Sequence, residues 1–119
     1  MPKILFVDDE PGLRLLYFDE FSEEGYEVFT AADCSEAAQR LEAGDIDLVV
    51  LDIQLKQESG LGLLQNIVKK QKDLPVILCS AYNCYKDDFS SWLADAYIVK
   101  SSDLSELKRE IALQLARRA

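Results

Sequence analysis

Polar and charged residues close four of the short apolar runs in this sequence. They are Asp8 with Asp9, Asp52, Ser80 and Lys100. Carboxylates gathered in one crevice repel one another at low effective dielectric, so such an arrangement requires a cation to neutralise it. Hard oxygen ligands suit Mg²⁺, which proteins usually hold with one or two carboxylates, water and phosphate oxygens. If the fold gathers these residues, their types predict a magnesium site.

Each of these residues also has an ordinary structural explanation when it is taken alone. An Asp-Asp pair after a strand commonly forms a polar loop or caps a helix. A serine after a strand, or a lysine ahead of the last helix, is ordinarily a surface residue. The functional interpretation therefore depends on whether the fold brings Asp8, Asp52 and Lys100 to the same place.

Short apolar runs alternate with helical patterns along the whole chain, which is typical of a parallel sheet covered by helices on both faces. The predicted strands are Lys3–Val7, Tyr26–Ala31, Asp47–Leu51, Val76–Cys79 and Ala96–Val99. The runs Ile4–Val7 and Leu48–Leu51 are continuously apolar, as strands buried on both faces should be. These two strands therefore belong in the middle of the sheet.

Helix signals fill the intervals between the predicted strands. Asp33 places a capping oxygen ahead of an amphipathic run, and Gly25 and Gly44 mark helix ends. The last helix carries one apolar stripe, formed by Leu104, Leu107, Ile111 and Leu115. Five strands and five helices in strict alternation, joined by right-handed crossovers, predict a doubly wound α/β sheet. Such sheets bind ligands at the carboxyl ends of their strands, where the polar residues named above stand.

Length and composition predict one compact domain, residues 1–119, with 49% hydrophobic residues. A formal net charge of -9 argues against a nucleic-acid surface, since phosphate binding depends on clustered Lys and Arg.

There is no histidine and no zinc pattern, so Cys34, Cys79 and Cys84 are expected to be free thiols in a reducing compartment. Cys79 should be buried in a strand and Cys84 more exposed, neither of them catalytic. The first apolar run stops at two aspartates, so it is neither a signal peptide nor a membrane span, and we expect a cytoplasmic domain.

Motifs spread over the chain add a further indication. They are Ile4–Glu10, Asp47–Asp52, Gly60, Ser80-Ala81 and Asp95–Lys100. With these motifs the chain resembles, over essentially its whole length, the CheY-like receiver domains of two-component response regulators. The resemblance implies a five-stranded flavodoxin-like sheet with strand order 2-1-3-4-5. It also implies a signalling switch in a phosphorelay, which accepts a phosphoryl group from a histidine kinase or a phosphotransfer protein.

The resemblance assigns four residues to phosphoryl acceptance and metal binding. Asp52 would be the phospho-acceptor. Asp9, Asp52 and the backbone carbonyl of Gln54 would hold Mg²⁺. Asp8 would reach the ion through water. This assignment agrees with the chemistry, because phosphoryl transfer asks the protein mainly for in-line positioning and charge neutralisation.

The remaining site residues are assigned to phosphoryl binding and switching. Ser80 would bond the phosphoryl group with its hydroxyl, and Lys100 would be the cationic partner of that group. By moving towards the phosphoryl group, Ser80 would vacate space that Tyr97 fills by rotating inward, as the equivalent aromatic does in the family. The altered surface would comprise the fourth helix, the fifth strand and the fifth helix, near residues 85–93 and 96–116. We expect an output protein or a homodimer partner to bind this face.

The sequence departs from the usual pattern of the family at a few positions. Leu55-Lys56 stands where Met-Pro is common, which we interpret as a change of loop stiffness because the spacing to the next glycine is kept. Gln54 and Tyr82 occupy positions that tune the rate of dephosphorylation in the family. Ser101 replaces the usual proline after Lys100, and we expect a trans bond there, because a cis bond without proline costs about 2.5–4 kcal/mol.

Two alternative functions remain open. A degenerate receiver would bind partners or dimerise constitutively without phosphorylation, although the complete set of site residues counts against it. A hydrolase of small phosphate esters would use Asp52 as nucleophile, but Gln54 cannot donate and recover a proton as a carboxyl group can. We therefore expect no enzyme activity beyond self-catalysed phosphoryl acceptance and slow autodephosphorylation.

Overall fold

The computed structural model describes residues 1–119 apart from 56–57, 72, 81–93, 101–102 and 119. Its main sheet consists of β1 (Lys3–Val7), β2 (Glu27–Ala31), β3 (Leu48–Asp52), β6 (Val76–Ser80) and β7 (Ala96–Val99). All five strands run parallel in the order β2-β1-β3-β6-β7, which confirms the predicted doubly wound sheet with strand order 2-1-3-4-5. The predicted position of β1 and β3 inside the sheet is also confirmed.

The predicted strands 26–31, 47–51 and 76–79 differ from β2, β3 and β6 by one residue at one or both ends. Tyr26 lies outside β2 because its amide donates to the carbonyl of Phe21 at the end of the preceding helix, at 3.2 Å. Asp52 and Ser80 are the last residues of β3 and β6 rather than the first residues after them, because the paired register extends through both. Both side chains are therefore anchored in the sheet itself.

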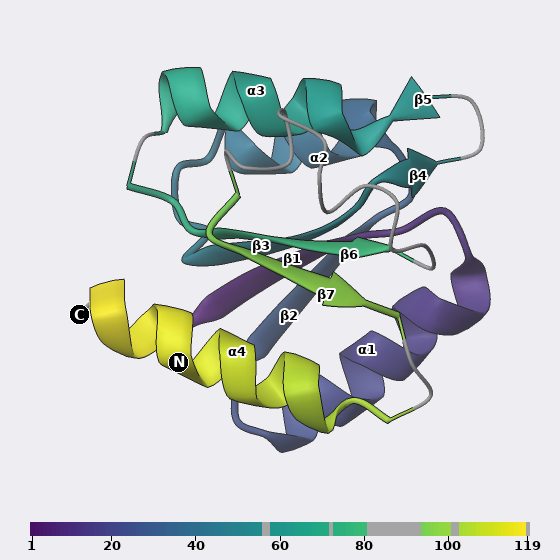
Figure 1. Cartoon of the computed structure of the whole chain (residues 1–119), viewed down its shortest axis with the longest axis vertical. Coiled ribbons are helices and arrows are strands. Elements are labelled where there is room, and N and C mark those ends of the chain that lie inside the picture. Colours follow the sequence, from purple (N-terminus) through teal and green to yellow (C-terminus); the bar gives the residue numbers. More distant parts are fainter. Residues whose placement is uncertain (56–57, 72, 81–93, 101–102, 119) are drawn as a thin grey trace.

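Helices cover both faces of the sheet (Figure 1). The helices α1 (Pro11–Glu23) and α4 (Ser105–Arg118) lie on one face, and α2 (Cys34–Leu41) and α3 (Gly60–Lys70) lie on the other. The helix α4 corresponds to the fifth helix predicted from the sequence. The predicted fourth helix, residues 85–93, lies outside the described residues. In the part of the chain that the structure describes, no helix is long and apolar enough to cross a membrane.

The predicted helix signals lie where the helices begin and end. Asp33 caps α2 by accepting a hydrogen bond from the amide of Glu36 at 2.8 Å. Gly25 and Gly44 follow α1 and α2 with φ angles of 94° and 74°, a left-handed conformation that favours glycine. These turns direct the chain back into the next strand.

The core consists of two apolar layers, one on each face of the sheet. Alternate positions of the central strands contribute to opposite layers, so that Leu5 packs towards α2 and α3 while Phe6 packs towards α1 and α4. The predicted stripe of α4 is confirmed, with Leu107 and Ile111 buried in the second layer. Gln114 of the same helix is also buried, which the apolar pattern did not predict.

A small two-stranded element that was not predicted follows β3. Its strands, β4 (Gln54–Leu55) and β5 (Glu58–Ser59), pair antiparallel outside the main sheet. Strands of two residues carry no alternation that a sequence pattern could reveal. This element turns the chain back so that α3 begins close to the end of β3.

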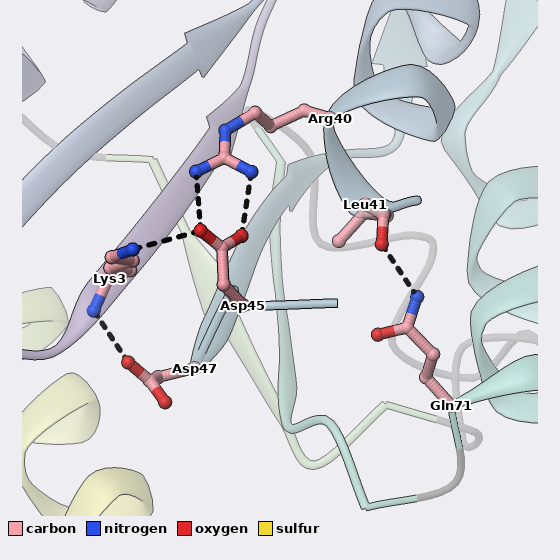
Figure 2. Close-up of polar contacts among 6 residues, drawn as sticks. All are labelled: Lys3, Arg40, Leu41, Asp45, Asp47 and Gln71. Carbon is pink, nitrogen blue, oxygen red and sulfur yellow. Dashed lines mark hydrogen bonds and ion pairs between the residues drawn. The ribbon is translucent and has the colours of Figure 1, made fainter. Parts of the chain in front are cut away.

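A group of ion pairs ties β1 to the segment between α2 and β3 (Figure 2). Asp45, in that segment, pairs with the Lys3 ammonium at 2.9 Å and with the Arg40 guanidinium at 2.7 Å. In the same view the side-chain amide of Gln71 donates to the carbonyl of Leu41 at 3.2 Å, which links the end of α3 to the end of α2. These contacts lie at the amino end of the central strands, opposite the strand ends that carry the polar residues.

We expect Asp45→Asn to lower the thermal unfolding midpoint by a few degrees near neutral pH. Hydrogen bonds from Arg40 and Lys3 hold the pKa of Asp45 below its ordinary value. A carboxylate with a lowered folded-state pKa stabilises the fold above its unfolded pKa of about 4, and that stabilisation is lost as the pH falls further. The difference between wild type and Asp45→Asn, measured by circular dichroism, should therefore shrink below pH of about 4. A difference that persists undiminished in acid would show that the charge of Asp45 is not what stabilises this end.

Candidate functional site

The polar residues singled out in the sequence meet at the carboxyl edge of the sheet. Asp8 follows β1, Asp52 ends β3, Ser80 ends β6 and Lys100 follows β7. Because these strands run parallel, their carboxyl ends lie at the same edge. Gln54 opens β4, two residues after Asp52. Residues that are far apart in the sequence therefore form one crevice.

Three carboxylates cluster in this crevice, and one oxygen from each of Asp8, Asp9 and Asp52 lies within 4.8 Å of the others. Asp8 and Asp52 are buried, with 2% and 5% of their surface exposed, whereas Asp9 is half-buried. Burial removes much of the water that would screen these charges, so the repulsion among them is strong. An all-oxygen set of this kind fits a hard divalent cation such as Mg²⁺.

The ammonium group of Lys100 lies between two of these carboxylates. Its Nζ atom is 2.9 Å from Oδ2 of Asp8 and 2.9 Å from Oδ2 of Asp52. Burial by itself would lower the pKa of Lys100, but the two ion pairs outweigh burial and raise the pKa above its ordinary value. Lys100 is therefore charged at neutral pH. One ammonium against three carboxylates leaves the described part of the crevice negative, which favours a further cation.

Backbone hydrogen bonds fix the residues that carry these charges. The amide of Asp8 donates to the carbonyl of Ala31 at 3.0 Å, and Oδ1 of Asp8 accepts from the amide of Glu10 at 3.0 Å. The amide of Lys100 donates to the carbonyl of Ser80 at 2.6 Å. The charged groups are thus positioned by the rigid sheet rather than by long loops.

Ser80 and Tyr97, the residues predicted to form a switch, lie on neighbouring strands. Ser80 is completely buried, whereas Tyr97 is half-buried and packs against the apolar layer beneath α2 and α3. The register of β6 and β7 pairs Tyr97 with Leu78, two positions before Ser80. Paired residues and alternate residues of parallel strands point to the same face of a sheet, so Ser80 and Tyr97 face the same side and lie diagonally to each other. This arrangement allows steric coupling between them.

The start of α3 approaches the end of β3 closely at Gly60. The amide of Gly60 donates to the carbonyl of Ile53 at 2.7 Å. A Cβ atom at this position would collide with the backbone carbonyl oxygen of Asp52. Glycine is therefore required here for close approach of two backbones, which explains its place in the sequence motif.

Some predicted features fall on residues outside the described part of the chain and stay predictions. They are Tyr82, Cys84, Lys56, the side chain of Gln54 and the Lys100-Ser101 peptide bond. Cys79, by contrast, is buried as predicted, and burial raises the pKa of its thiol to about 11. Because a thiolate is the reactive form, Cys79 is an inert core residue at neutral pH.

The fold and the crevice together define a doubly wound α/β domain with a candidate cation site at the carboxyl edge of its sheet. The sequence matches the response regulator receiver domain family over residues 4–112, and the chain belongs to that family. It is therefore a receiver domain of two-component signalling, as the motifs predicted.

Individual relatives agree with this assignment. The probable transcriptional regulator ycf27 of Cyanophora paradoxa is 37% identical over 117 residues, which are 97% of this chain and 48% of that protein. Response regulator TrrA of Thermotoga maritima, crystallised in complex with Mg²⁺-BeF, is 46% identical with a TM-score of 0.92 over 96% of this chain and 99% of TrrA. TrrA in complex with histidine kinase ThkA gives 47% identity and a TM-score of 0.90 over 97% and 99% of the two chains. The chain spans about half the length of the first curated relatives it matches.

The close approach at Gly60 predicts that a methyl group added at this position lowers the stability of the fold. Gly60→Ala should destabilise the fold by about 1–3 kcal/mol, because the Cβ atom forces the backbones of α3 and β3 apart. Gly62→Ala is the matched control, since a Cβ atom there meets nothing within 4 Å and alanine favours the helix by about 0.5–1 kcal/mol. Urea unfolding of both variants measures the difference. Equal stability of the two would show that the contact with Asp52 imposes no constraint.

Proposed function

We propose that this receiver domain is a Mg²⁺-dependent phospho-acceptor switch in which Asp52 receives a phosphoryl group from a histidine kinase or a phosphotransfer protein. The observation that supports this most directly is the surroundings of the Asp52 carboxylate. It lies within 4.8 Å of the carboxylates of Asp8 and Asp9 and 2.9 Å from the Lys100 ammonium. The complexes of TrrA with Mg²⁺-BeF and with histidine kinase ThkA support both the ion and the kind of partner.

The ion would be held by Asp9, Asp52 and the backbone carbonyl of Gln54. Asp8 is already engaged by Lys100 and by the amide of Glu10, which suits a residue that reaches the ion through water. When bound, Mg²⁺ supplies positive charge against the carboxylates and the phosphoryl oxygens. The chain's own residues then position the acceptor and the incoming group.

The step proposed for Asp52 is one in-line displacement at phosphorus. A carboxylate oxygen of Asp52 forms the new O–P bond while the P–N bond to the donor histidine breaks. The leaving imidazole nitrogen keeps the bonding electron pair and is neutralised by a proton. No protein base is required, because the carboxylate is already ionised as nucleophile. The Lys100 ammonium, a point charge on a flexible stem, leaves a carboxylate oxygen and contacts a phosphoryl oxygen instead. The Ser80 hydroxyl donates a hydrogen bond to a second phosphoryl oxygen.

The two other functions fit the site less well. A constitutive binding module has no need of an acidic cluster buried against a lysine, because such a cluster costs stability unless a charged ligand uses it. A phosphate-ester hydrolase would need a proton donor near the leaving group. Gln54, two residues beyond Asp52, cannot serve as one.

Incubation with a small acyl phosphate and Mg²⁺ should add one phosphoryl group to Asp52, detected by mass spectrometry. Asp52→Asn and treatment with a chelator should each abolish labelling, because the first removes the nucleophile and the second leaves the acidic crevice to repel the donor. Asp45→Asn removes a carboxylate at the other end of the sheet and should label like wild type. Labelling that survives in Asp52→Asn would move the acceptor elsewhere, and steady turnover of the donor would favour a hydrolase.

Phosphorylation is proposed to change the surface through Ser80 and Tyr97. Ser80 can bond a phosphoryl oxygen by moving towards Asp52, and Tyr97 then rotates into the space beside it on the same face of the sheet. Phosphate shifts the populations of two existing conformations by binding them unequally. The face that changes comprises β7, α4 and the predicted helix over 85–93, and an output protein or a second copy of the chain binds there.

Amide NMR spectra with and without beryllofluoride and Mg²⁺ test this coupling. The largest shifts should fall at the crevice and along β7 and α4. Ser80→Ala should still bind beryllofluoride but lose most of the shifts near Tyr97, because the hydrogen bond that moves the serine is gone. A distal response equal to that of wild type would separate Tyr97 from Ser80 and refute this route.

We further propose the bounds of the domain and the compartment in which it works. Residues 1–119 form one receiver domain that works in the cytoplasm, where its cysteines stay reduced. Its own chemistry is confined to phosphoryl acceptance and slow autodephosphorylation. Gln54 and Tyr82 are proposed to tune the rate of that loss, by analogy with the family positions that they occupy.

A further inference from the structure

We propose that Arg14 is a positioning residue for the cation site, acting on the peptide bond that joins Asp8 to Asp9. This inference rests on the proposed function of the crevice. Arg14 lies in the first turns of α1, six positions after Asp8, and its side chain is half-buried. Its Nη1 atom donates a hydrogen bond of 2.8 Å to the backbone carbonyl of Asp8.

That hydrogen bond completes a set of contacts that fixes Asp8 on every side. The amide of Asp8 is held by Ala31, and its carboxylate is held by the Glu10 amide and by Lys100. The carbonyl that Arg14 holds belongs to the peptide plane leading into Asp9. Orienting this plane sets the direction in which the Asp9 side chain leaves the backbone, and Asp9 is the half-buried member of the acidic cluster.

The start of α1 has no side-chain cap that would hold it against the turn after β1. The N-cap residue of α1, Glu10, makes no side-chain capping hydrogen bond, and Pro11 occupies the first helical position and has no N–H. The amide of Arg14 donates to the carbonyl of Glu10 at 3.1 Å, which closes the first helical turn. Arg14 therefore stabilises the turn with two hydrogen bonds, one from its backbone amide and one from its guanidinium group.

An effect of Arg14 through its charge and an effect through its hydrogen bond predict opposite changes in Mg²⁺ affinity when the side chain is removed. If Arg14 acted only as a nearby positive charge, its loss would make the crevice more negative and Mg²⁺ would bind more tightly. If Arg14 positions Asp9, its loss releases a ligand from its binding orientation and Mg²⁺ binds more weakly. Residues that orient metal ligands typically change metal affinity about 10–100-fold when they are replaced.

The test is a titration of the chain with Mg²⁺ followed by amide NMR, which reads metal affinity without any phosphorylation. Arg14→Met keeps the apolar stem and removes the donor, and Arg14→Lys keeps the charge and an N–H donor that is one bond nearer the backbone. Arg40→Met is the matched control, because it removes an arginine ion pair remote from the crevice. Urea unfolding of each variant measures how much its free energy of unfolding falls.

We expect about tenfold weaker Mg²⁺ binding in Arg14→Met, substantial recovery in Arg14→Lys, and wild-type affinity in Arg40→Met at comparable loss of stability. Labelling of Arg14→Met at saturating Mg²⁺ should approach the wild-type rate. If wild type binds Mg²⁺ and Arg14→Met binds it equally or more tightly, the role of Arg14 is refuted while the proposed function stands. Wild-type protein that binds no Mg²⁺ would overturn the proposed function, and this inference with it.

Discussion

Three carboxylates and one ammonium group are held together at one edge of a rigid sheet, and the rest of the structure accommodates that concentration of charge. Buried like charges destabilise a fold, because each loses hydration and repels its neighbours. Lys100 relieves part of this repulsion by pairing with both Asp8 and Asp52. The remaining excess of negative charge favours binding of a cation in the crevice. We propose that the same repulsion that costs stability makes the crevice respond to a phosphoryl group.

The architecture tolerates this charge because the groups stand on paired strands. Asp52 and Ser80 are the last residues of β3 and β6, and Asp8 and Lys100 follow β1 and β7 directly. Two apolar layers hold the sheet from both faces. At the amino end of the central strands, the ion pairs of Asp45 join β1 to the segment before β3. A change at the carboxyl edge can therefore alter side chains there while the remainder of the sheet stays in place.

Much of this arrangement could be predicted because it follows from periodicity and topology. Continuous apolar runs indicated the two central strands, and the parallel order then brought Asp8, Asp52 and Lys100 to one edge. The bounds of β1 and β7 were predicted correctly, whereas β2, β3 and β6 differ from the prediction by one residue at one or both ends, because hydrogen-bonded register rather than hydrophobicity decides where a strand stops. Arg14 was missed, because an arginine on the first turns of a helix has the pattern of an ordinary surface residue. Its hydrogen bond to Asp8 exists only through the geometry of the turn.

The most direct test of the central claim is a crystal structure of this chain grown with Mg²⁺ and beryllofluoride. We expect beryllium bonded to a carboxylate oxygen of Asp52 and Mg²⁺ ligated by Asp9, Asp52 and the carbonyl of Gln54. We also expect the Lys100 ammonium to contact a fluoride. An Asp52 carboxylate that remains paired with Lys100 and unmodified, or beryllofluoride bound to another carboxylate, would contradict it.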